Sequence, residues 1–409
     1  MSNSTPRFGV NYVPSNNWWY SWLDWDRESI KSDLEVIAGL GMDHIRIHCL
    51  WPTFQPNPAK VSKTALAHLV DLLGIADEVG LDVCVCVLDG WLSGFAFYPP
   101  WQKSQNMFTA PSMIAAEKKL FTEIASAVAD HPRFLGFDLG NELGVLQYGV
   151  NAVSQTAADL WQEEMLALCE RVTPRKMHVT GVDHVHWFSN HGFSRQALAT
   201  QGSVTSLHTW IKFTGAMDRY EPLDAGSVHL PEYCIELARA YHTDPNRKIW
   251  LQEFGCSKHW LDERDIPKFA EQSIAAALSC DKLWGVTWWC SHDIDEAYSD
   301  FDPLEYDLGL IDCKNNVKPV GAAVAALIQT ARGQSPAAYV VSRSTALVLP
   351  DNFFDPNSGF TAWDAGTSFM KLIEDGIRPS IVLESRIEDL DYLASRGIET
   401  LVPVQPEMG

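Results

Sequence analysis

Short runs of apolar residues alternate with amphipathic segments along most of the chain. Eight of these runs have the length and composition of buried β-strands, and they cover residues 8–14, 44–51, 81–90, 134–142, 176–183, 204–210, 248–255 and 283–292. Segments whose apolar residues have helical spacing lie between these runs. In residues 26–40, apolar side chains recur at Ile30, Leu34 and Ile37, and Gly41 is a residue type that ends helices. The pattern predicts strands and helices in regular alternation.

The remaining amphipathic segments complete this alternation. They cover residues 64–79, 112–129, 152–172, 194–200, 231–242, 266–280 and 317–331, of which 194–200 has the weakest pattern. Eight strand–helix units within about 330 residues fit a (β/α)8 TIM barrel with loop insertions. An open doubly wound sheet would show a G-x-G-x-x-G turn after an early strand, and the first strand instead runs into Asn11-Tyr12-Val13-Pro14-Ser15. We therefore predict a barrel domain in residues 1–333.

The pattern restarts on a smaller scale after a Gly/Ser/Pro turn at residues 333–336. The expected strands are residues 345–350, 380–385 and 399–404, and the expected helices are residues 365–375 and 387–396. We predict a small α/β appendix in residues 334–409. Three strands cannot cover both faces of their own sheet, so the appendix should pack on the barrel or on a neighbouring subunit of a homo-oligomer.

Charge and cysteine usage narrow the class of protein. The chain has 31 Lys and Arg against 52 Asp and Glu, a formal charge of −21, which disfavours nucleic acid and anionic membranes as partners. No apolar run approaches the length of a membrane span. The first ten residues lack the apolar core of a secretory signal, and the nine cysteines include no C-x-x-C pair. These features predict a cytoplasmic protein with reduced thiols.

Aromatic residues are abundant, with 16 Trp, 18 Phe and 11 Tyr. Trp19 belongs to an aromatic run after the first strand, and Trp91 belongs to a second cluster after the third strand. About half of such rings pack loops, and the others are available to stack on the apolar faces of sugars. Both residues are therefore candidates for substrate binding.

Polar and aromatic residues stand at the carboxyl ends of the predicted strands, where barrel enzymes carry their active sites. They include Arg46, Asn141, Glu142, Asp183, His184, His186, His208, Trp210, Gln252, Glu253 and Trp288. Glycosidic cleavage needs two facing carboxylates, because one protonates the leaving oxygen and the other attacks the anomeric carbon. Glu142 and Glu253 end the fourth and seventh strands, and Arg46 would hold one of them ionised.

The residues at these strand ends resemble glycoside hydrolases of clan A, most closely family 5. The resemblance covers residues 8–331, and its strongest motifs are Gly140-Asn141-Glu142, Gln252-Glu253-Phe254-Gly255 and Val286-Thr287-Trp288-Trp289. It implies that Glu142 is the general acid/base and Glu253 the nucleophile of a retaining double displacement.

The resemblance also implies roles for neighbouring residues. Asn141 would bind the sugar 2-hydroxyl, Arg46 would lie beside the nucleophile, His208 would line the pocket and Trp288 would form the platform under the sugar. The family commonly has His-x-Tyr on the sixth strand, where this chain has His208-Thr209-Trp210. Either another hydroxyl, such as that of Tyr12 or Tyr298, replaces the family's tyrosine, or none does; Trp210 is expected to bind substrate.

The pair His184-x-His186 offers a different interpretation. Alternate residues of a strand share a face, so the two imidazoles have the spacing of metal ligands. The sequence offers no convincing third ligand, and the two glutamates already explain the site. We therefore expect no metal and no cofactor, and we expect both histidines to bind sugar or to stabilise the fold.

These observations predict an enzyme that cleaves short oligosaccharides inside the cell. The chain resembles a bacterial family 5 group of β-mannosidases that act on the Manβ1-4GlcNAc linkage of the N-glycan core. A β-glucosidase, a β-galactosidase and an endo-β-mannanase remain alternatives, because no residue identifies the glycone. A non-catalytic sugar-binding barrel and a metal-dependent hydrolase using His184 and His186 are alternatives of other classes.

Overall fold

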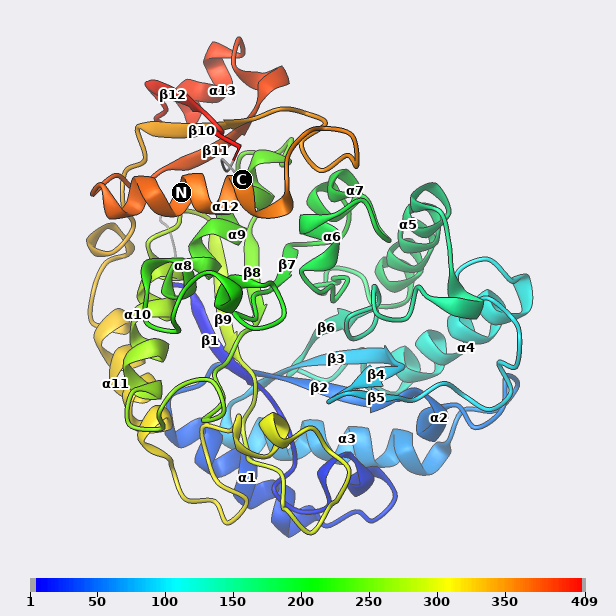
Figure 1. Cartoon of the computed structure of the whole chain (residues 1–409). Helices are drawn as coiled ribbons and strands as arrows, with labels where there is room; N and C mark the ends of the chain where they lie inside the picture. Colours follow the sequence, from blue (N-terminus) through cyan, green and yellow to red (C-terminus); the bar gives the residue numbers. More distant parts are fainter. Residues whose placement is uncertain (1–4, 407–409) are drawn as a thin grey trace.

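A parallel sheet curls around the centre of the molecule in the computed structural model, which describes residues 5–406 (Figure 1). Its strands are β1 (Arg7–Asn11), β2 (His44–Leu50), β3 (Asp82–Asp89), β6 (Phe134–Asp138), β7 (Thr205–His208), β8 (Ile249–Glu253) and β9 (Leu283–Trp288). They are arranged in the order β6-β3-β2-β1-β9-β8-β7, and every pair is parallel. Almost every strand residue is buried, which explains the continuous apolar runs in the sequence.

The remaining position of the barrel is held by residues 176–183, which form no regular strand. Their backbone bonds to β6: Met177 N–H donates to Leu135 O (3.0 Å) and Val179 N–H donates to Phe137 O (2.9 Å). On the β7 side, Ser206 Oγ donates to Thr180 O at 2.5 Å. The segment therefore closes the ring where the fifth strand was predicted, and the (β/α)8 TIM-barrel fold is confirmed.

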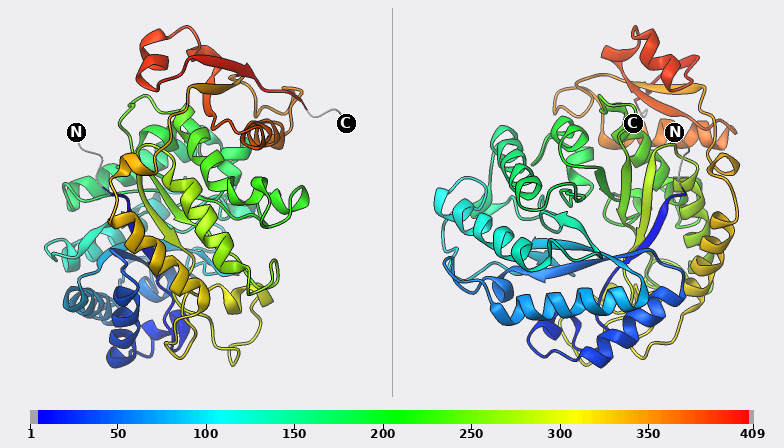
Figure 2. Two further views of the ribbon diagram at one scale, coloured as in Figure 1. Left: turned by 90° about the vertical axis from the view of Figure 1, so that its left-hand side faces the viewer. Right: turned by 180° about the vertical axis from the view of Figure 1, so that it is seen from behind.

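Helices surround the sheet on its outer face (Figure 2). They are α1 (Arg27–Gly39), α3 (Lys63–Val79), α4 (Pro111–Val128), α5 (Gln155–Val172), α7 (Arg195–Thr200), α9 (Leu230–Ala240), α10 (Ile266–Leu278) and α11 (Pro319–Arg332). Asp26, Ser62, Ser154 and Ser194 cap four of them, because each side chain accepts a hydrogen bond from a backbone N–H of the first turn. These caps fix where the predicted helices begin.

Short elements that the periodicity did not predict lie in the loops. They are α2 (Trp51–Phe54), α6 (Val185–Phe188), α8 (Ala225–Val228), the hairpin β4 (Trp91–Leu92) and β5 (Phe95–Ala96), and the 3-10 turns η1 (Trp18–Trp22), η2 (Gly149–Asn151), η3 (Ala216–Asp218), η4 (Pro303–Asp307), η5 (Pro336–Ala338) and η6 (Glu384–Arg386). Aromatic contacts join three of these loops. The Trp18 ring lies 5.8 Å from Phe97 and 5.0 Å from Phe301, centroid to centroid. The loops after the first, third and eighth barrel positions therefore form one wall.

The C-terminal part forms a second, three-stranded parallel sheet. Its elements are β10 (Thr345–Leu349), α12 (Ala362–Glu374), β11 (Ser380–Leu383), α13 (Leu390–Ser395) and β12 (Thr400–Pro403), with the strand order β11-β10-β12. Figure 1 shows this unit at the top, beside α9 and α8. The residues of its sheet and of α12 continue the apolar core of the barrel. The division at residue 333 stays a prediction, and residues 1–4 and 407–409 of the two predicted domains lie outside the described range.

Buried ion pairs fasten the C-terminal unit to α9. Arg343 lies 2.5 Å from Glu232, and Arg396 lies 2.9 Å from Glu236. A third arginine, Arg378, also pairs with Glu232 at 2.5 Å. Both glutamates are completely buried, so their charges depend on these arginines. The appendix thus packs on the barrel of its own chain.

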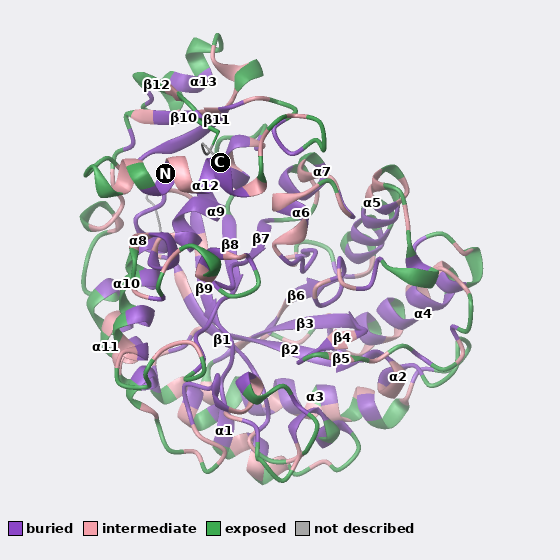
Figure 3. Cartoon of the chain, in the orientation of Figure 1, coloured by how far each residue is buried: buried purple, intermediate pink, exposed green. Residues whose placement is uncertain are grey.

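Burial divides the molecule into an apolar interior and polar loops (Figure 3). The strands and the inward faces of the helices are buried, and the exposed residues lie on the outer faces of the helices and in parts of the connections. Within residues 5–406, no helix has both the length and the apolar character needed to cross a bilayer.

Candidate active site

A cavity of about 360 Å³ opens at the carboxyl ends of the barrel strands. It is lined by Trp91, Ser93, Gly94, Asn141, Glu142, Val145, Asp183, His184, Val185, Trp210, Phe213, Glu253, Trp289, Asp302, Leu304 and Glu305. We call it the central cavity. It brings together the two glutamates that the sequence singled out, from opposite sides of the ring.

Glu142 and Glu253 line the central cavity, and His208, which was also expected to line it, is not among the lining residues but contacts both glutamates. We call these three residues the floor of the central cavity. One carboxylate oxygen of Glu142, one of Glu253 and a ring nitrogen of His208 all lie within 4.8 Å of one another. His208 Nδ1 is 3.0 Å from Glu142 Oε1 and 3.2 Å from Glu253 Oε2. Glu142 has a backbone φ of 42°, a left-handed conformation that costs energy outside glycine and is often found at functional sites. The chain therefore holds these acids close together at some conformational cost.

Arg46 connects the floor to the barrel interior. Its Nη1 donates to Glu253 Oε1 at 2.6 Å, its Nε donates to Asp138 Oδ2 at 2.8 Å and its Nη2 donates to Asn141 Oδ1 at 2.9 Å. The side chain is completely buried. Since a guanidinium stays charged, Arg46 supplies a fixed positive charge beneath Glu253, as the sequence predicted.

The two acids differ in their electrostatic surroundings. Burial raises the pKa of Glu142 to about 7, although Arg46 and the Trp91 side chain act in the opposite direction. Burial also raises the pKa of Glu253, but the ion pair with Arg46 counteracts it. The ion pair with Arg46, at 2.6 Å, favours the charged form of Glu253. Of the two acids, Glu142 is thus the better suited to carry a proton, and Glu253, paired with the Arg46 guanidinium, is the better suited to be ionised.

Hydrogen bonds around His208 support the same assignment. Gln252 Nε2 donates to the Asp138 carboxylate at 3.1 Å, so Gln252 Oε1 faces His208 Nε2 at 3.0 Å and accepts a hydrogen bond from its N–H. Burial lowers the pKa of His208 and favours the neutral ring. A neutral ring protonated at Nε2 presents the lone pair of Nδ1 to the glutamates. A proton on Glu142 then completes the hydrogen bond between Glu142 and His208.

Several of the other predicted residues line the central cavity. Trp91, Trp210, Asn141 and His184 all belong to its wall. Asn141 Nδ2 donates to Trp91 O at 2.8 Å, which fixes the amide beside Glu142. Burial lowers the pKa of His184 to about 4, so its ring is neutral near pH 7. These positions agree with a role in binding a neutral, hydroxyl-rich ligand.

Trp288, the residue predicted to form the platform, does not line the central cavity, whereas the next residue does. Trp288 is buried in the barrel wall, where its Nε1 donates to Leu308 O at 2.9 Å and its ring packs against Phe254. Trp289 follows the end of β9 and lines the central cavity. Adjacent residues of an extended chain point to opposite faces, and the sequence pattern did not show which ring faces inward.

Trp19 and His186 are not among the residues that line the central cavity. Trp19 is buried in the loop wall, with its ring 5.2 Å from His48. His186 lies in the short helix α6, where its Nδ1 is 2.9 Å from His191 O. Because α6 replaces the end of a strand, His184 and His186 do not share a strand face.

Neither histidine belongs to a cluster of potential metal ligands. Among the described residues, two sets of three ligand atoms come within 4.8 Å of one another, and they are His48, Cys86 and Asp89, and Glu142, His208 and Glu253. The first set is buried beside the Arg46 guanidinium, whose charge opposes a cation. The second is the floor of the central cavity.

The two tyrosines considered as substitutes for the family's strand-six tyrosine lie elsewhere. The Tyr12 hydroxyl donates to Asp33 at 2.9 Å, and the Tyr298 hydroxyl donates to Asn17 at 2.8 Å. Neither lines the central cavity. The contacts of Glu253 come from Arg46 and His208 instead.

Other lining residues were not singled out from the sequence. They are Ser93, Gly94, Val145, Val185, Phe213, Asp302, Leu304 and Glu305. They stand in the hairpin after β3 and in the loops after the fourth, fifth, sixth and eighth barrel positions, where no periodic pattern marks them. For Glu305, the one available signal was the helix-start pair Asp302-Pro303.

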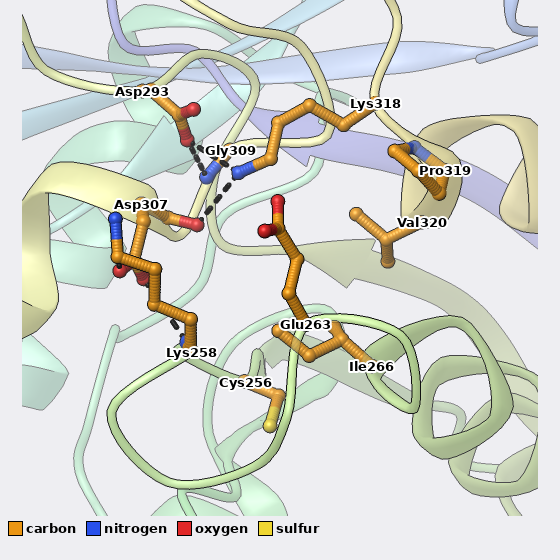
Figure 4. A pocket seen from close by; sticks show the side chains of 10 residues that line it. All are labelled: Cys256, Lys258, Glu263, Ile266, Asp293, Asp307, Gly309, Lys318, Pro319 and Val320. Atoms are coloured by element: carbon orange, nitrogen blue, oxygen red, sulfur yellow. Dashed lines mark hydrogen bonds and ion pairs between the residues drawn. The ribbon is translucent and has the colours of Figure 1, made fainter.

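A second cavity of about 70 Å³ lies beside α10 and α11 (Figure 4). Lys318 Nζ spans it, at 2.8 Å from both Asp293 Oδ1 and Asp307 O, and Glu263 also lines it. Neither proposed catalytic glutamate reaches this cavity. Lys318 is already paired there with Asp293 and the backbone of Asp307, and both glutamates line the larger cavity, so the central cavity is the candidate active site.

Comparisons with known proteins agree with this geometry. The family model "Cellulase (glycosyl hydrolase family 5)" matches residues 4–294. A GH5_18 variant from Streptomyces cattleya, solved with Manβ1-4GlcNAc, is 37% identical and has a TM-score of 0.92, with 97% of this chain and 98% of that chain covered. A GH5_18 protein from Bifidobacterium longum subsp. infantis is 34% identical with a TM-score of 0.92, covering 98% and 97%.

A more distant structure shares the fold. The exo-β-1,4-mannosidase Op5Man5 from Opitutaceae bacterium strain TAV5 is 23% identical with a TM-score of 0.79, over 93% of this chain and 70% of that chain. The search among curated proteins gave no match. The family model spans most of the chain, and the GH5_18 structures cover nearly all of it. The chain belongs to glycoside hydrolase family 5 and is a glycoside hydrolase built on a (β/α)8 barrel.

Proposed function

We propose that the protein is a retaining exo-β-mannosidase that cleaves short β-mannosides such as Manβ1-4GlcNAc. The observation that carries the mechanism is the separation of the two glutamates, whose facing carboxylate oxygens lie within 4.8 Å. Retaining enzymes hold their carboxyl groups about 5–5.5 Å apart, whereas inverting enzymes need roughly 6.5–9.5 Å to admit a water molecule. The short separation supports double displacement.

The surroundings of each glutamate support its role. Glu253, paired with Arg46, attacks the anomeric carbon and forms a glycosyl ester while the bond to the leaving oxygen breaks. Glu142, whose pKa is raised to about 7, gives its proton to that oxygen. Glu142 then takes a proton from water, which cleaves the ester and releases Glu253. Asn141 is placed beside Glu142 to bind the sugar 2-hydroxyl.

The proposed substrate is supported by the relatives. GH5_18 variants from Streptomyces cattleya and from Bifidobacterium longum subsp. longum were both solved with Manβ1-4GlcNAc. Their identities of 37% and 32% extend over 97% and 98% of this chain. The wall formed by the three aromatic-linked loops supports exo action, because it stands beside one end of the central cavity.

The proposal places the reaction in the cytoplasm, with an oligosaccharide as the substrate. All nine cysteines are free, and eight of them are buried. Reduced thiols in this number are typical of a reducing compartment.

A substrate panel with stereochemical analysis tests the proposal. Purified protein is assayed with p-nitrophenyl β-mannoside, β-glucoside and β-galactoside, with Manβ1-4GlcNAc, and with mannohexaose. We expect turnover of the β-mannoside and of Manβ1-4GlcNAc, and time-resolved NMR should show the β-anomer of mannose first. Preference for another glycoside would refute the substrate, and an α-anomer formed first would refute the retaining mechanism.

Substitution of the nucleophile separates an enzyme from a sugar-binding barrel. Glu253→Ala should lower turnover by several orders of magnitude, and Glu296→Gln, at an exposed residue, is the matched control. Unchanged turnover by Glu253→Ala would contradict the assignment of Glu253.

A further inference from the structure

Glu305 lines the central cavity but has no part in the mechanism above. It lies in η4, in the loop after the eighth barrel position. Its Oε2 is buried and has no hydrogen-bond partner in the part of the chain that the structure describes. Buried carboxyl oxygens are normally hydrogen-bonded. This oxygen is therefore available to hydrogen-bond a ligand.

The surroundings of Glu305 favour an uncharged carboxyl group. Burial raises the pKa of Glu305 to about 8, the charges of Glu142 and Glu253 act in the same direction, and the Ser93 hydroxyl acts against them. A protonated carboxyl group both donates and accepts hydrogen bonds. Sugar hydroxyls do the same, which makes them suitable partners for this group.

The position of Glu305 indicates which sugar it meets. Asp183 and His184 follow the fifth barrel position, next to Glu142, which protonates the leaving group in the proposed mechanism. Glu305 follows the eighth position, which in a ring of eight lies opposite the fourth, the position that carries Glu142. The leaving group therefore lies towards Asp183, and the glycone lies towards Glu305.

The neighbourhood of Glu305 also limits how far the glycone can extend. The loop that carries it also contains Phe301, which packs on Trp18, and Tyr306 donates to the backbone oxygen of Tyr298 at 2.6 Å. These contacts hold η4 against the aromatic wall. A side chain on a held loop can define the end of a binding site.

We propose that Glu305 is a specificity-determining residue that hydrogen-bonds the C-4 and C-6 hydroxyls of the glycone and thereby selects an unsubstituted, terminal sugar. The inference rests on the proposed function, since it takes the central cavity to hold one glycone sugar. A further sugar joined at C-4 would displace the hydroxyl that Glu305 binds. Exo action then follows from the hydrogen bond between Glu305 and the C-4 hydroxyl, as well as from the wall formed by the loops after the first, third and eighth barrel positions.

A thermodynamic cycle between residue and hydroxyl tests the contact. The wild type, Glu305→Ala and Glu305→Gln are assayed with the aryl β-glycoside that the wild type cleaves best, and with its 4-deoxy, 6-deoxy and 2-deoxy analogues. We expect Glu305→Ala to lower kcat/KM by about 10- to 100-fold and to remove most of the 4-deoxy or 6-deoxy penalty. Glu305→Gln, which keeps a donor and an acceptor, should retain more activity.

Two controls make the result specific. The 2-deoxy penalty should persist in Glu305→Ala, because Asn141 rather than Glu305 is placed to bind that hydroxyl. Asp300→Asn, at an exposed residue of the same loop with a φ of 73° that asparagine tolerates, should leave kcat/KM unchanged. Labelling of Glu253 by a 2-deoxy-2-fluoro glycoside, together with an unchanged Tm, shows that each variant is folded.

The outcomes separate this inference from the proposed function. Equal 4-deoxy and 6-deoxy penalties in the wild type and in folded Glu305→Ala would overturn the role of Glu305. If the wild type prefers a glycoside other than a mannoside, the substrate proposal fails, but the same cycle on that glycoside still tests Glu305.

Discussion

Arg46 Nη1 lies 2.6 Å from Glu253 Oε1, while the hydrogen bonds of the same guanidinium to Asp138 and Asn141 hold it in place. Glu142 contacts the neutral ring of His208 and the side chain of Trp91. One fixed cation thus distinguishes two carboxyl groups that share a cavity. This asymmetry supports the proposal that Glu253 is the nucleophile and Glu142 the acid.

The pH dependence should report the proton on Glu142. Because the acid must be protonated, kcat/KM should fall as the pH rises through about 7, the raised pKa of Glu142. Glu142→Gln should remove this basic limb and lower cleavage of Manβ1-4GlcNAc by roughly 10²- to 10⁴-fold. A 2,4-dinitrophenyl glycoside, whose leaving group needs no proton, should react far better than Manβ1-4GlcNAc in the variant. A basic limb that survives in Glu142→Gln would point to another group.

The adjacent tryptophans should separate binding from stability. Trp289→Ala removes a ring from the wall of the central cavity and should lower kcat/KM by about 10- to 100-fold with a small change in Tm. Trp288→Ala removes a buried ring and its hydrogen bond to Leu308 O, and should cost about 3–5 kcal/mol of stability. Thermal unfolding and kinetics on both variants provide the comparison. The reverse pattern would restore Trp288 as the platform.

Acid should weaken the junction between α9 and the C-terminal unit. Burial acts to raise the pKa of Glu236, but Arg239, Arg343 and Arg396 lower it to about 2. An unfolded glutamate has a pKa of about 4.3, so the stabilisation is complete above that pH and is lost as the pH falls towards 2. The difference corresponds to roughly 3 kcal/mol at neutral pH.

Glu236→Gln should therefore lower Tm at pH 7 and flatten its dependence on pH between about 4.3 and 2. Calorimetry at several pH values measures both effects. Glu374→Gln, at an exposed residue of α12, is the control and should change neither. An acid dependence that is identical in the wild type and in Glu236→Gln would show that other carboxylates govern it.

The sequence was sufficient to predict the barrel and the floor of the site. Seven strands that are buried on both faces left continuous apolar runs, and a glutamate at or after the end of such a run is rare enough to be informative. Glu142 and Glu253 were found in this way, and Arg46 stood out as a cation within an apolar strand. These features depend on local pattern and on the order of the strands.

The walls of the site could not be predicted in the same way. Trp288 and Trp289 are chemically identical, and the backbone conformation at the end of β9 decides which ring faces the cavity. The position of His186 depends on the short helix α6, which is too short to show a periodic pattern in the sequence. Glu305 belongs to a loop whose position is set by contacts with distant aromatic residues, such as that between Phe301 and Trp18. Tertiary packing determines all three.

The segment that completes the ring has a consequence for how the barrel tolerates change. At most junctions of the sheet, adjacent strands are joined through main-chain atoms, which no side-chain substitution removes. Between residues 176–183 and β7, closure also depends on hydroxyl groups, since Ser206 donates to Thr180 O and Ser203 Oγ accepts from His178 N–H. Point substitutions at these hydroxyl residues can therefore change the wall beside Asp183 and His184. In the proposed mechanism, such changes would alter the specificity for the leaving group without altering the two glutamates.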